Sequence, residues 1–504
     1  MKIYKWSLLA TSLLLLNLTI ISCSSNDGGE PIDDGMNMTD DDGGTNLETA
    51  REETNTILTG NASKTWKIES ALLRNDQGEF TITENFNVQD DEFVFSGDVG
   101  SGMLEWRPGN DINLGATDAN GTLLDYYLAP ESYSFSFTEE SSDMLTSIDG
   151  QFAFTVVDDT TLTGTITFSG RSNAAGEELV LTLGEKTAED YANPPSEGLV
   201  FTEIGSIQAF NQFGQQNNLG FIGSSRNNSL FIAHRDDCDV NNLRNRVIKF
   251  DLGTQQSIEN KTDLEDFFTR KLNIVNNEVI LTGGLNIYTY DLDLLSDPVV
   301  TPHNAGTLSR FSTAVVDNDV YVTGGDLNEV ADKIRRIDRN TGTLEIVANL
   351  PSPKVHAGSE IVNNKLYVFS GRQEFFEDET VETTSYIYDL TEGTFQNFDT
   401  PVALYNTYAS RFENLIFIAG DTRTNVDDKD VTNDDYDVWL GVYDTLTGEF
   451  TEIDHNLDDS DQFSYIQQMT VFNNKIYVLY GDVSRIDSNN NCAEFPWSIM
   501  VADL

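Results

Sequence analysis

A strand phrase that recurs six times in the second half of the chain constrains the fold more than any other feature. Each copy opens with an asparagine and runs, after one further residue, into an apolar strand that usually ends in glycine, as in residues 318–325 and 364–371. Successive asparagines lie 49, 41, 46, 50 and 60 residues apart. They are Asn228, Asn277, Asn318, Asn364, Asn414 and Asn474. A period near 50 with a strand in each unit predicts the blades of a β-propeller rather than a helical solenoid.

A second phrase follows each copy of the first, an apolar strand that ends in aspartate. Examples are Phe250-Asp251 and Tyr388-Asp389, and turn residues with another short strand come next. Each unit therefore has four predicted strands and resembles the kelch blade. The resemblance covers about residues 200–504. Paired glycines survive in two of the six repeats and the usual tryptophan is missing, so the chain resembles a divergent member.

The sixth unit determines how the predicted ring closes. The chain reaches Leu504 just after the third strand of that unit, whereas residues 199–204 form a strand-like run with no blade of their own. We expect that run to be the outer strand of blade six, because this pairing covers two open sheet edges and joins the ends of the ring. The propeller is thus expected to span residues 197–504.

Residues 54–190 contain no kelch phrase and have seven or more short strand-like runs separated by turn signals. This spacing predicts a small antiparallel barrel or sandwich, so the whole chain is expected to be all-β. The opening residues 58–68 resemble the start of the lipocalin-like domains of Bacteroidetes lipoproteins. That resemblance implies that Trp66, on the first strand, plugs one end of a barrel.

The first 22 residues are typical of a signal peptide, with Lys2 and Lys5 before a Leu-rich run. The sequence Ile-Ile-Ser-Cys that ends at Cys23 resembles the lipobox of bacterial lipoproteins, which implies a lipid anchor on Cys23. The alternative is an ordinary secretory signal with a chance cysteine. Residues 23–53 are predicted to be a disordered acidic tether. The stretch after Cys23 resembles a surface-export signal of Bacteroidetes, which implies an outer-membrane, surface-exposed lipoprotein.

The chain is strongly acidic, with 83 Asp and Glu against 30 Lys and Arg. Such a charge repels phosphate backbones, so nucleic-acid binding is excluded, and neutral glycans, cationic groups or Ca²⁺-bridged ligands are the expected partners. Adaptation to a salty habitat explains the same composition. The weak calcium candidates are Asp427, Asp428, Asp430, Asp434 and Asp435, but their spacing matches no calcium loop and a solvated acidic loop is the preferred interpretation. No other cofactor is predicted, and we expect a monomer.

Cys238 and Cys492 are the two cysteines besides Cys23. They fall in equivalent long loops of blades one and six, which are neighbours in a closed ring. We therefore expect a disulfide between them in an oxidising compartment, and two free thiols in exposed loops are the alternative.

The sequence contains no convergent catalytic set. Arg270, Arg310 and His356 stand at the starts of inner strands, where they are candidates for ligand binding. The predicted propeller also resembles the six-bladed sialic-acid epimerases. That resemblance implies an arginine that binds a carboxylate and an acid/base group in the central pocket. The alternative function is therefore a carbohydrate-active enzyme of the cell envelope. The same three residues are also explained without a ligand, as polar side chains that line the solvated central channel of a propeller. Tyr405, Tyr408 and Tyr465 are aromatic candidates for sugar binding on the long-loop face. The favoured function is a non-enzymatic binding protein for a glycan or a protein partner.

We predict that the mature chain begins at an acylated Cys23, since the basic n-region and the lipobox occur together. Mass spectrometry of the N-terminal peptide from membranes checks this, and Cys23→Ser should release the protein into the soluble fraction. An unmodified N-terminus beyond residue 23 would contradict the anchor.

Overall fold

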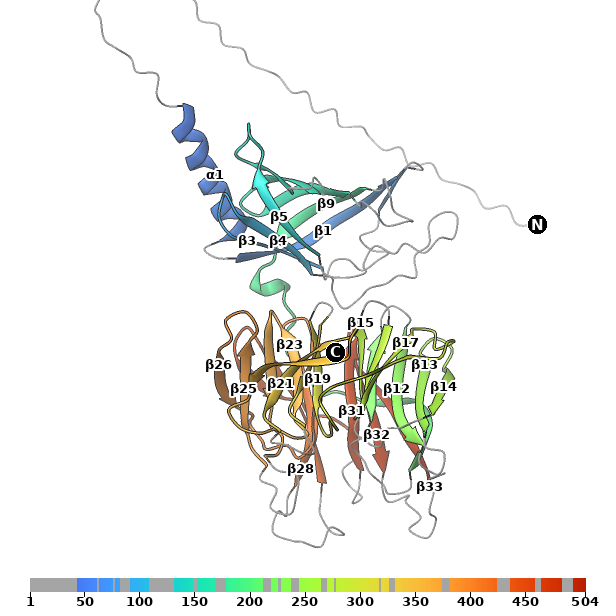
Figure 1. Ribbon diagram of the computed structural model, residues 1–504. Helices are drawn as coiled ribbons and strands as arrows, with labels where there is room; N and C mark the ends of the chain where they lie inside the picture. Colours follow the sequence, from blue (N-terminus) through green and yellow to red (C-terminus); the bar gives the residue numbers. More distant parts are fainter. Residues whose placement is uncertain are drawn as a thin grey trace, which may run out of the picture. The chain divides into compact units, whose positions relative to one another are not determined.

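The computed structural model shows two all-β parts, a barrel and a six-bladed propeller (Figure 1). It describes residues 43–60, 63–75, 78–81, 91–107, 131–147, 152–167, 178–211, 219–224, 228–236, 244–263, 270–275, 278–316, 319–325, 331–373, 381–423, 436–457, 464–482 and 493–504. The all-β prediction is confirmed. Within these ranges no helix has the length and apolar character needed to span a bilayer.

Helix α1 (Gly43–Thr59) occupies the region where the sequence analysis placed the end of a disordered tether. The acidic run ends at Asp42, and the residues beyond it supply apolar side chains, of which Leu58 is fully buried. Polar contacts also hold the helix: the Asn55 amide donates to the Gly97 carbonyl at 3.1 Å, and Arg51 Nε donates to the Ser141 carbonyl at 3.0 Å. These tertiary contacts stabilise a segment whose composition alone predicts coil.

The barrel has eight antiparallel strands, and the pairing of β1 with β9 closes it. This pairing answers the question that the sequence left open between a barrel and a sandwich. Its strands are β1 (Ser63–Asn75), β3 (Glu92–Ser96), β4 (Gly102–Arg107), β5 (Glu131–Phe137), β6 (Met144–Ser147), β7 (Phe152–Asp158), β8 (Thr161–Thr167) and β9 (Glu178–Glu185), with β2 (Gly78–Thr81) added beside β1. Trp66 is fully buried on β1 and donates to the Leu58 carbonyl at 3.0 Å. Aromatic rings such as Phe93 and Phe154 fill the interior.

Six four-stranded antiparallel sheets form the propeller, as the repeats predict. From the innermost strand outward, blade one contains β11 (Gly220–Ser224), β12 (Ser229–Asp236), β13 (Arg244–Asp251) and β14 (Gln256–Asp263), and blade two β15 (Lys271–Val275), β16 (Glu278–Thr282), β17 (Asn286–Asp291) and β18 (Val299–Pro302). Blade three contains β19 (Ser312–Val316), β20 (Asp319–Thr323), β21 (Lys333–Asp338) and β22 (Thr343–Asn349), and blade four β23 (Gly358–Val362), β24 (Lys365–Phe369), β25 (Thr384–Asp389) and β26 (Phe395–Asp399). Blade five contains β27 (Thr407–Phe412), β28 (Leu415–Arg423), β29 (Tyr436–Asp444) and β30 (Glu449–Glu452), and blade six β31 (Ser464–Phe472), β32 (Lys475–Asp482), β33 (Ala493–Asp503) and β10 (Thr202–Asn211).

The two recurring sequence phrases have physical roles at opposite turns of a blade. Three asparagines of the first phrase adopt left-handed backbone angles between the first two strands, with φ of 45° at Asn228, 57° at Asn364 and 54° at Asn474, whereas in blade five the preceding residue Glu413 does so with φ of 51°. Asparagine tolerates this region better than most residues do. Aspartates of the second phrase accept backbone hydrogen bonds in the next turn, such as the 2.7 Å bond from the Thr254 amide to Asp251 and the 2.9 Å bond from the Thr391 amide to Asp389. The phrases therefore encode turns.

The predicted ring closure is confirmed. Strand β10 pairs along its length with β33, so the segment ahead of blade one completes blade six. The strand begins at Thr202 rather than at Leu199, which instead forms an isolated bridge with His455. Between them, Phe201 exchanges two hydrogen bonds with the Asn456 side chain, at 2.6 and 3.1 Å.

We predict that deletion of β10 abolishes cooperative unfolding of the propeller and promotes aggregation, because it exposes the edge of β33. A graded variant, Ile207→Ala, should cost about 2–5 kcal/mol, since this side chain is 95% buried in the core between blades six and one. Thermal melting followed by circular dichroism measures both effects.

The exposed Glu203 on the same strand provides the control, and Glu203→Ala should change the free energy of unfolding by no more than about 0.5 kcal/mol. A β10 deletion that melts like the wild type would show that this strand does not close the ring.

Candidate functional site

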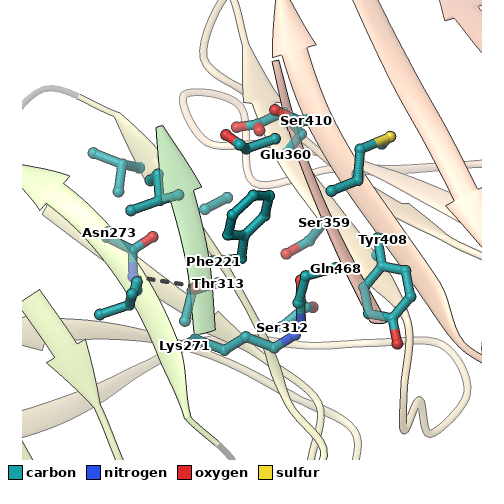
Figure 2. Close-up of a pocket in the computed structure, with 18 of the residues that line it drawn as sticks. Phe221, Lys271, Asn273, Ser312, Thr313, Ser359, Glu360, Tyr408, Ser410 and Gln468 are labelled. Atoms are coloured by element: carbon teal, nitrogen blue, oxygen red, sulfur yellow. Dashed lines mark hydrogen bonds between the residues drawn. The ribbon is translucent and has the colours of Figure 1, made fainter. Parts of the chain in front are cut away.

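A cavity of about 150 Å³ lies at the centre of the propeller, lined by residues from all six inner strands (Figure 2). Its lining is mixed, with Phe221, Leu272 and Met469 beside hydroxyl, amide and charged side chains. Figure 2 shows Lys271 and Tyr408 toward one end and Glu360 and Ser410 toward the other. The position follows from topology, because only the inner strand of each blade faces the axis.

Several buried polar atoms in and beside this cavity have no hydrogen-bond partner among the residues that the structure describes. They are Ser312 Oγ, Ser359 Oγ, Thr407 Oγ1 and Gln467 Oε1, each in a residue no more than 5% exposed. Leaving such a group unsatisfied costs about 1–3 kcal/mol. Water or a ligand in the cavity would supply the missing partners, so the wall is suited to a polar occupant.

One end of the cavity has an unusual backbone. We call it the mouth and define it by Arg270, Lys271, Arg310, His356 and Arg372, which lie where inner strands begin or where the paired second strand has just ended. Arg310 and His356, at equivalent positions of blades three and four, adopt φ of 57° and 56°. Left-handed backbone at two non-glycine residues is sparsely populated and stores strain.

Hydrogen bonds between blades compensate that strain. The His356 amide donates to the Arg310 carbonyl at 2.9 Å, and the Thr407 amide donates to the His356 carbonyl at 2.9 Å. These two bonds link blades three, four and five at the mouth, so the main chain there is fixed by neighbours on both sides.

His356 is 92% buried, and its Nε2 has no hydrogen-bond partner within the described ranges. Burial lowers its pKa well below the ordinary 6.5, and the positive charges of Arg372, Arg310 and Lys271 lower it further. The imidazole is therefore neutral at pH 7. The same interactions show that three cationic groups lie within electrostatic reach of this one ring.

Arg372 is held rigidly at the mouth. Its guanidinium carbon lies 3.3 Å from the centroid of the Tyr405 ring, its Nε donates to the Tyr405 carbonyl at 3.0 Å, and its Nη2 donates to Asn406 Oδ1 at 3.2 Å. The Asn406 amide in turn donates to Asp421 at 3.0 Å. A stacked and hydrogen-bonded guanidinium is preorganised to recognise a planar anion.

Lys271 is the cation that enters the cavity itself. Burial lowers its pKa to about 8. Its Nζ lies 5.6 Å from the centroid of the Tyr408 ring, and no ion pair joins it to any residue in the described part of the chain. By contrast, the buried Lys354 is paired with Glu382 at 3.2 Å and donates to the Thr384 carbonyl at 2.7 Å.

Four residues that define the mouth are cationic, Arg270, Lys271, Arg310 and Arg372, and Asp421 lies beside them through its hydrogen bond with Asn406. A further carboxyl group, that of Glu360, lines the cavity. In the whole chain, by contrast, acidic residues outnumber basic ones by more than two to one. A group of cationic side chains beside a polar cavity is suited to an anionic ligand.

The structure brings together three of the residues proposed from the sequence. Arg270, Arg310 and His356 all lie at the mouth, and Arg270 is 99% buried. Tyr408 does not form an exposed platform, because it belongs to inner strand β27 and is 93% buried in the cavity wall. Tyr405 stacks on Arg372, whereas the side chain of Tyr465 lies outside the described residues.

The other predicted sites lie outside the described residues. These are Cys23, Cys238, Cys492 and the calcium candidates Asp427, Asp428, Asp430, Asp434 and Asp435. In the described part of the chain, no three His, Cys, Asp or Glu side chains group closely enough to hold a metal ion.

Sequence reasoning missed Lys271, Arg372 and Gln467. A comparison of equivalent inner-strand positions finds Lys271, since it aligns with the polar residues Ser312, Tyr408 and Gln468 of other blades. Arg372 carries no such signal, because it reaches the mouth from the residues that follow β24.

No protein-family model matches the chain, and no curated protein is significantly similar to it.

We predict that Lys271→Met raises the free energy of unfolding at pH 7 by about 1–3 kcal/mol, because it removes a buried ammonium group that lacks a carboxylate partner. The folded-state pKa lies below the ordinary 10.5, so between about pH 8 and 10.5 the unfolded chain holds a proton that the folded chain has lost. The free energy of unfolding of the wild type therefore rises with pH through that window, and the difference in stability between Lys271→Met and the wild type decreases. Thermal melts over this pH range measure the difference.

Lys249→Met is the matched control, because Lys249 is paired with Asp293 at 2.9 Å outside the cavity. It should give no gain at any pH. A Lys271→Met variant that is less stable than the wild type at pH 7 would contradict this account of the site.

Proposed function

We propose that this chain is a lipid-anchored binding protein of the cell envelope, whose propeller takes the acidic group of a small ligand or glycan into its mouth. The observation that supports the ligand class is that Arg372, Arg310 and Lys271 all lie close enough to the buried His356 ring for their charges to lower its pKa. The anchor rests on the lipobox at Cys23.

Arginine is suited to this role. A guanidinium binds a carboxylate through two parallel hydrogen bonds, and such charge-assisted bonds are about twice as strong as neutral ones. Arg372 is already oriented by Tyr405 and Asn406, so binding costs little side-chain entropy. The hydroxyl groups of Ser312, Ser359 and Thr407 offer further partners to a polar ligand.

The cavity limits what can enter. A volume of about 150 Å³ is comparable to an engineered cavity that admits a six-carbon ring, so one terminal group fits inside while the rest of a glycan stays outside. That remainder would meet the long-loop face, where Tyr405 lies beside the mouth.

The acidic surface does not preclude an anionic ligand in a salty medium. At physiological ionic strength exposed charges are screened beyond about 8 Å, whereas buried charges are screened much less. The mouth therefore acts at short range on a ligand that has already reached it.

An envelope enzyme of the sialic-acid epimerase kind is the second candidate. A buried, neutral His356 beside several cations favours it, because such an imidazole can exchange a proton with a bound sugar. The two functions differ in one observable, since a binding protein returns the sugar unchanged and an epimerase alters its anomeric ratio, which NMR records.

Calorimetry with the full-length protein tests the ligand class. We expect glucuronate or N-acetylneuraminate to bind and glucose to bind at least ten-fold more weakly. Arg310→Gln should lower the affinity for the acidic sugar by about ten- to a hundred-fold, the effect of losing one charge-assisted hydrogen bond.

Arg336→Gln is the control, because Arg336 is exposed on β21 and paired with Glu345 at 2.8 Å. It should leave the affinity unchanged. Equal binding of glucose and glucuronate, or binding that ignores Arg310→Gln, would contradict the proposal. If the chain binds a protein and Arg310→Gln does not lower the affinity for that protein, the alternative of a protein partner on the loops would be favoured.

A further inference from the structure

Lys271 has a position that anion recognition alone does not explain. It begins β15, and Figure 2 shows its side chain reaching across the end of the cavity toward Ser312 and Gln468. The two arginines near His356 already supply fixed positive charge. A lysine inside a cavity that lacks a carboxylate partner among the described residues is costly, whereas the buried Lys354 has the partner Glu382.

We propose that Lys271 is a covalent attachment site, at which its Nζ condenses with the carbonyl carbon of a small keto or aldehyde ligand to form an imine. The best-fitting class is an α-keto acid, whose carboxylate would be held by Arg310 and Arg372. In that respect the inference rests on the proposed function.

The reaction balances without an oxidant or a reductant. The Nζ lone pair attacks the carbonyl carbon, and the carbonyl oxygen takes up a proton to give a carbinolamine. Loss of that hydroxyl group as water then forms the carbon–nitrogen double bond. One amine, one carbonyl and one proton yield one protonated imine and one water.

The surroundings of Lys271 supply what each step needs. Because burial holds its pKa near 8, a substantial fraction of the amine is neutral and nucleophilic at mildly alkaline pH. The hydroxyl groups of Ser312 and Ser359 have unmet hydrogen-bonding capacity within the described residues, which suits the carbinolamine oxygen. The neutral His356 is near enough to Lys271 for the lysine charge to lower the pKa of the imidazole, and this imidazole can accept and donate a proton during the reaction.

Size also favours an α-keto acid. Pyruvate has as many heavy atoms as benzene, which a dry cavity of about 150 Å³ admits, so pyruvate fits where a whole sugar does not. The keto group lies next to the carboxylate, which matches a lysine whose charge acts on the same His356 ring as the charges of Arg310 and Arg372.

Reductive trapping tests the inference on the full-length protein. Pyruvate and cyanoborohydride are added together, and peptide mass spectrometry locates the reduced adduct. We expect stoichiometric labelling of Lys271, a yield that rises from about pH 6 to about pH 9 as the amine loses its proton, and at least ten-fold less labelling with the neutral ketone acetone.

Two partly buried, ion-paired lysines in the same sample serve as internal controls. Lys249 and Lys333 should remain at background, and Lys271→Arg, which keeps the charge but cannot form this imine, should remove the adduct. Labelling spread evenly over surface lysines, or no adduct on Lys271 with either ketone, overturns the inference.

The outcomes separate this inference from the function on which it rests. Calorimetric binding of pyruvate that requires Arg310 but leaves Lys271 unlabelled refutes the imine and retains the anion site. An adduct on Lys271 that forms equally with acetone supports the imine and contradicts the anion site.

Discussion

The pairing of β10 with β33 is the constraint on which the propeller depends. It joins residues about 300 positions apart in the sequence and converts six separate sheets into a ring in which each inner strand has a neighbour on both sides. The central cavity exists only because of this closure, since its wall takes residues from the first inner strand, β11, and from the last, β31. Contacts of such long range make ring closure a slow step in folding.

Most of the fold could be predicted from the sequence because the repeat encodes turns as well as strands. Asparagines such as Asn364 mark left-handed turns, and aspartates such as Asp389 hold the turn that leads to the outer strand, so blade boundaries follow from two residue types. Closure of the barrel could not be predicted, because it depends on the register between β1 and β9 rather than on any local pattern. Helix α1 was missed because its stability comes from tertiary contacts of residues such as Asn55 and Leu58.

Residues of the site could be predicted from the sequence only where their position in the repeat places them at the start of an inner strand. Arg310 and His356 could be located because each stands two residues before an inner strand. Arg372 could not, since its approach to the mouth depends on stacking with Tyr405 from another blade. Tyr408 could not be assigned to the cavity wall from its own strand, because alternation in a single short strand does not reveal which face meets the axis.

Backbone hydrogen bonds, rather than side chains, link Arg310, His356 and Thr407 at the mouth. The main chain fixes the distances between blades there, so the side chains at these positions are not required to hold the ring together. Evolution can therefore exchange them one at a time and change what the mouth recognises, provided that each replacement tolerates the left-handed backbone at positions 310 and 356. That condition disfavours β-branched residues, which restricts the set of specificities this propeller can acquire by single substitutions at those positions.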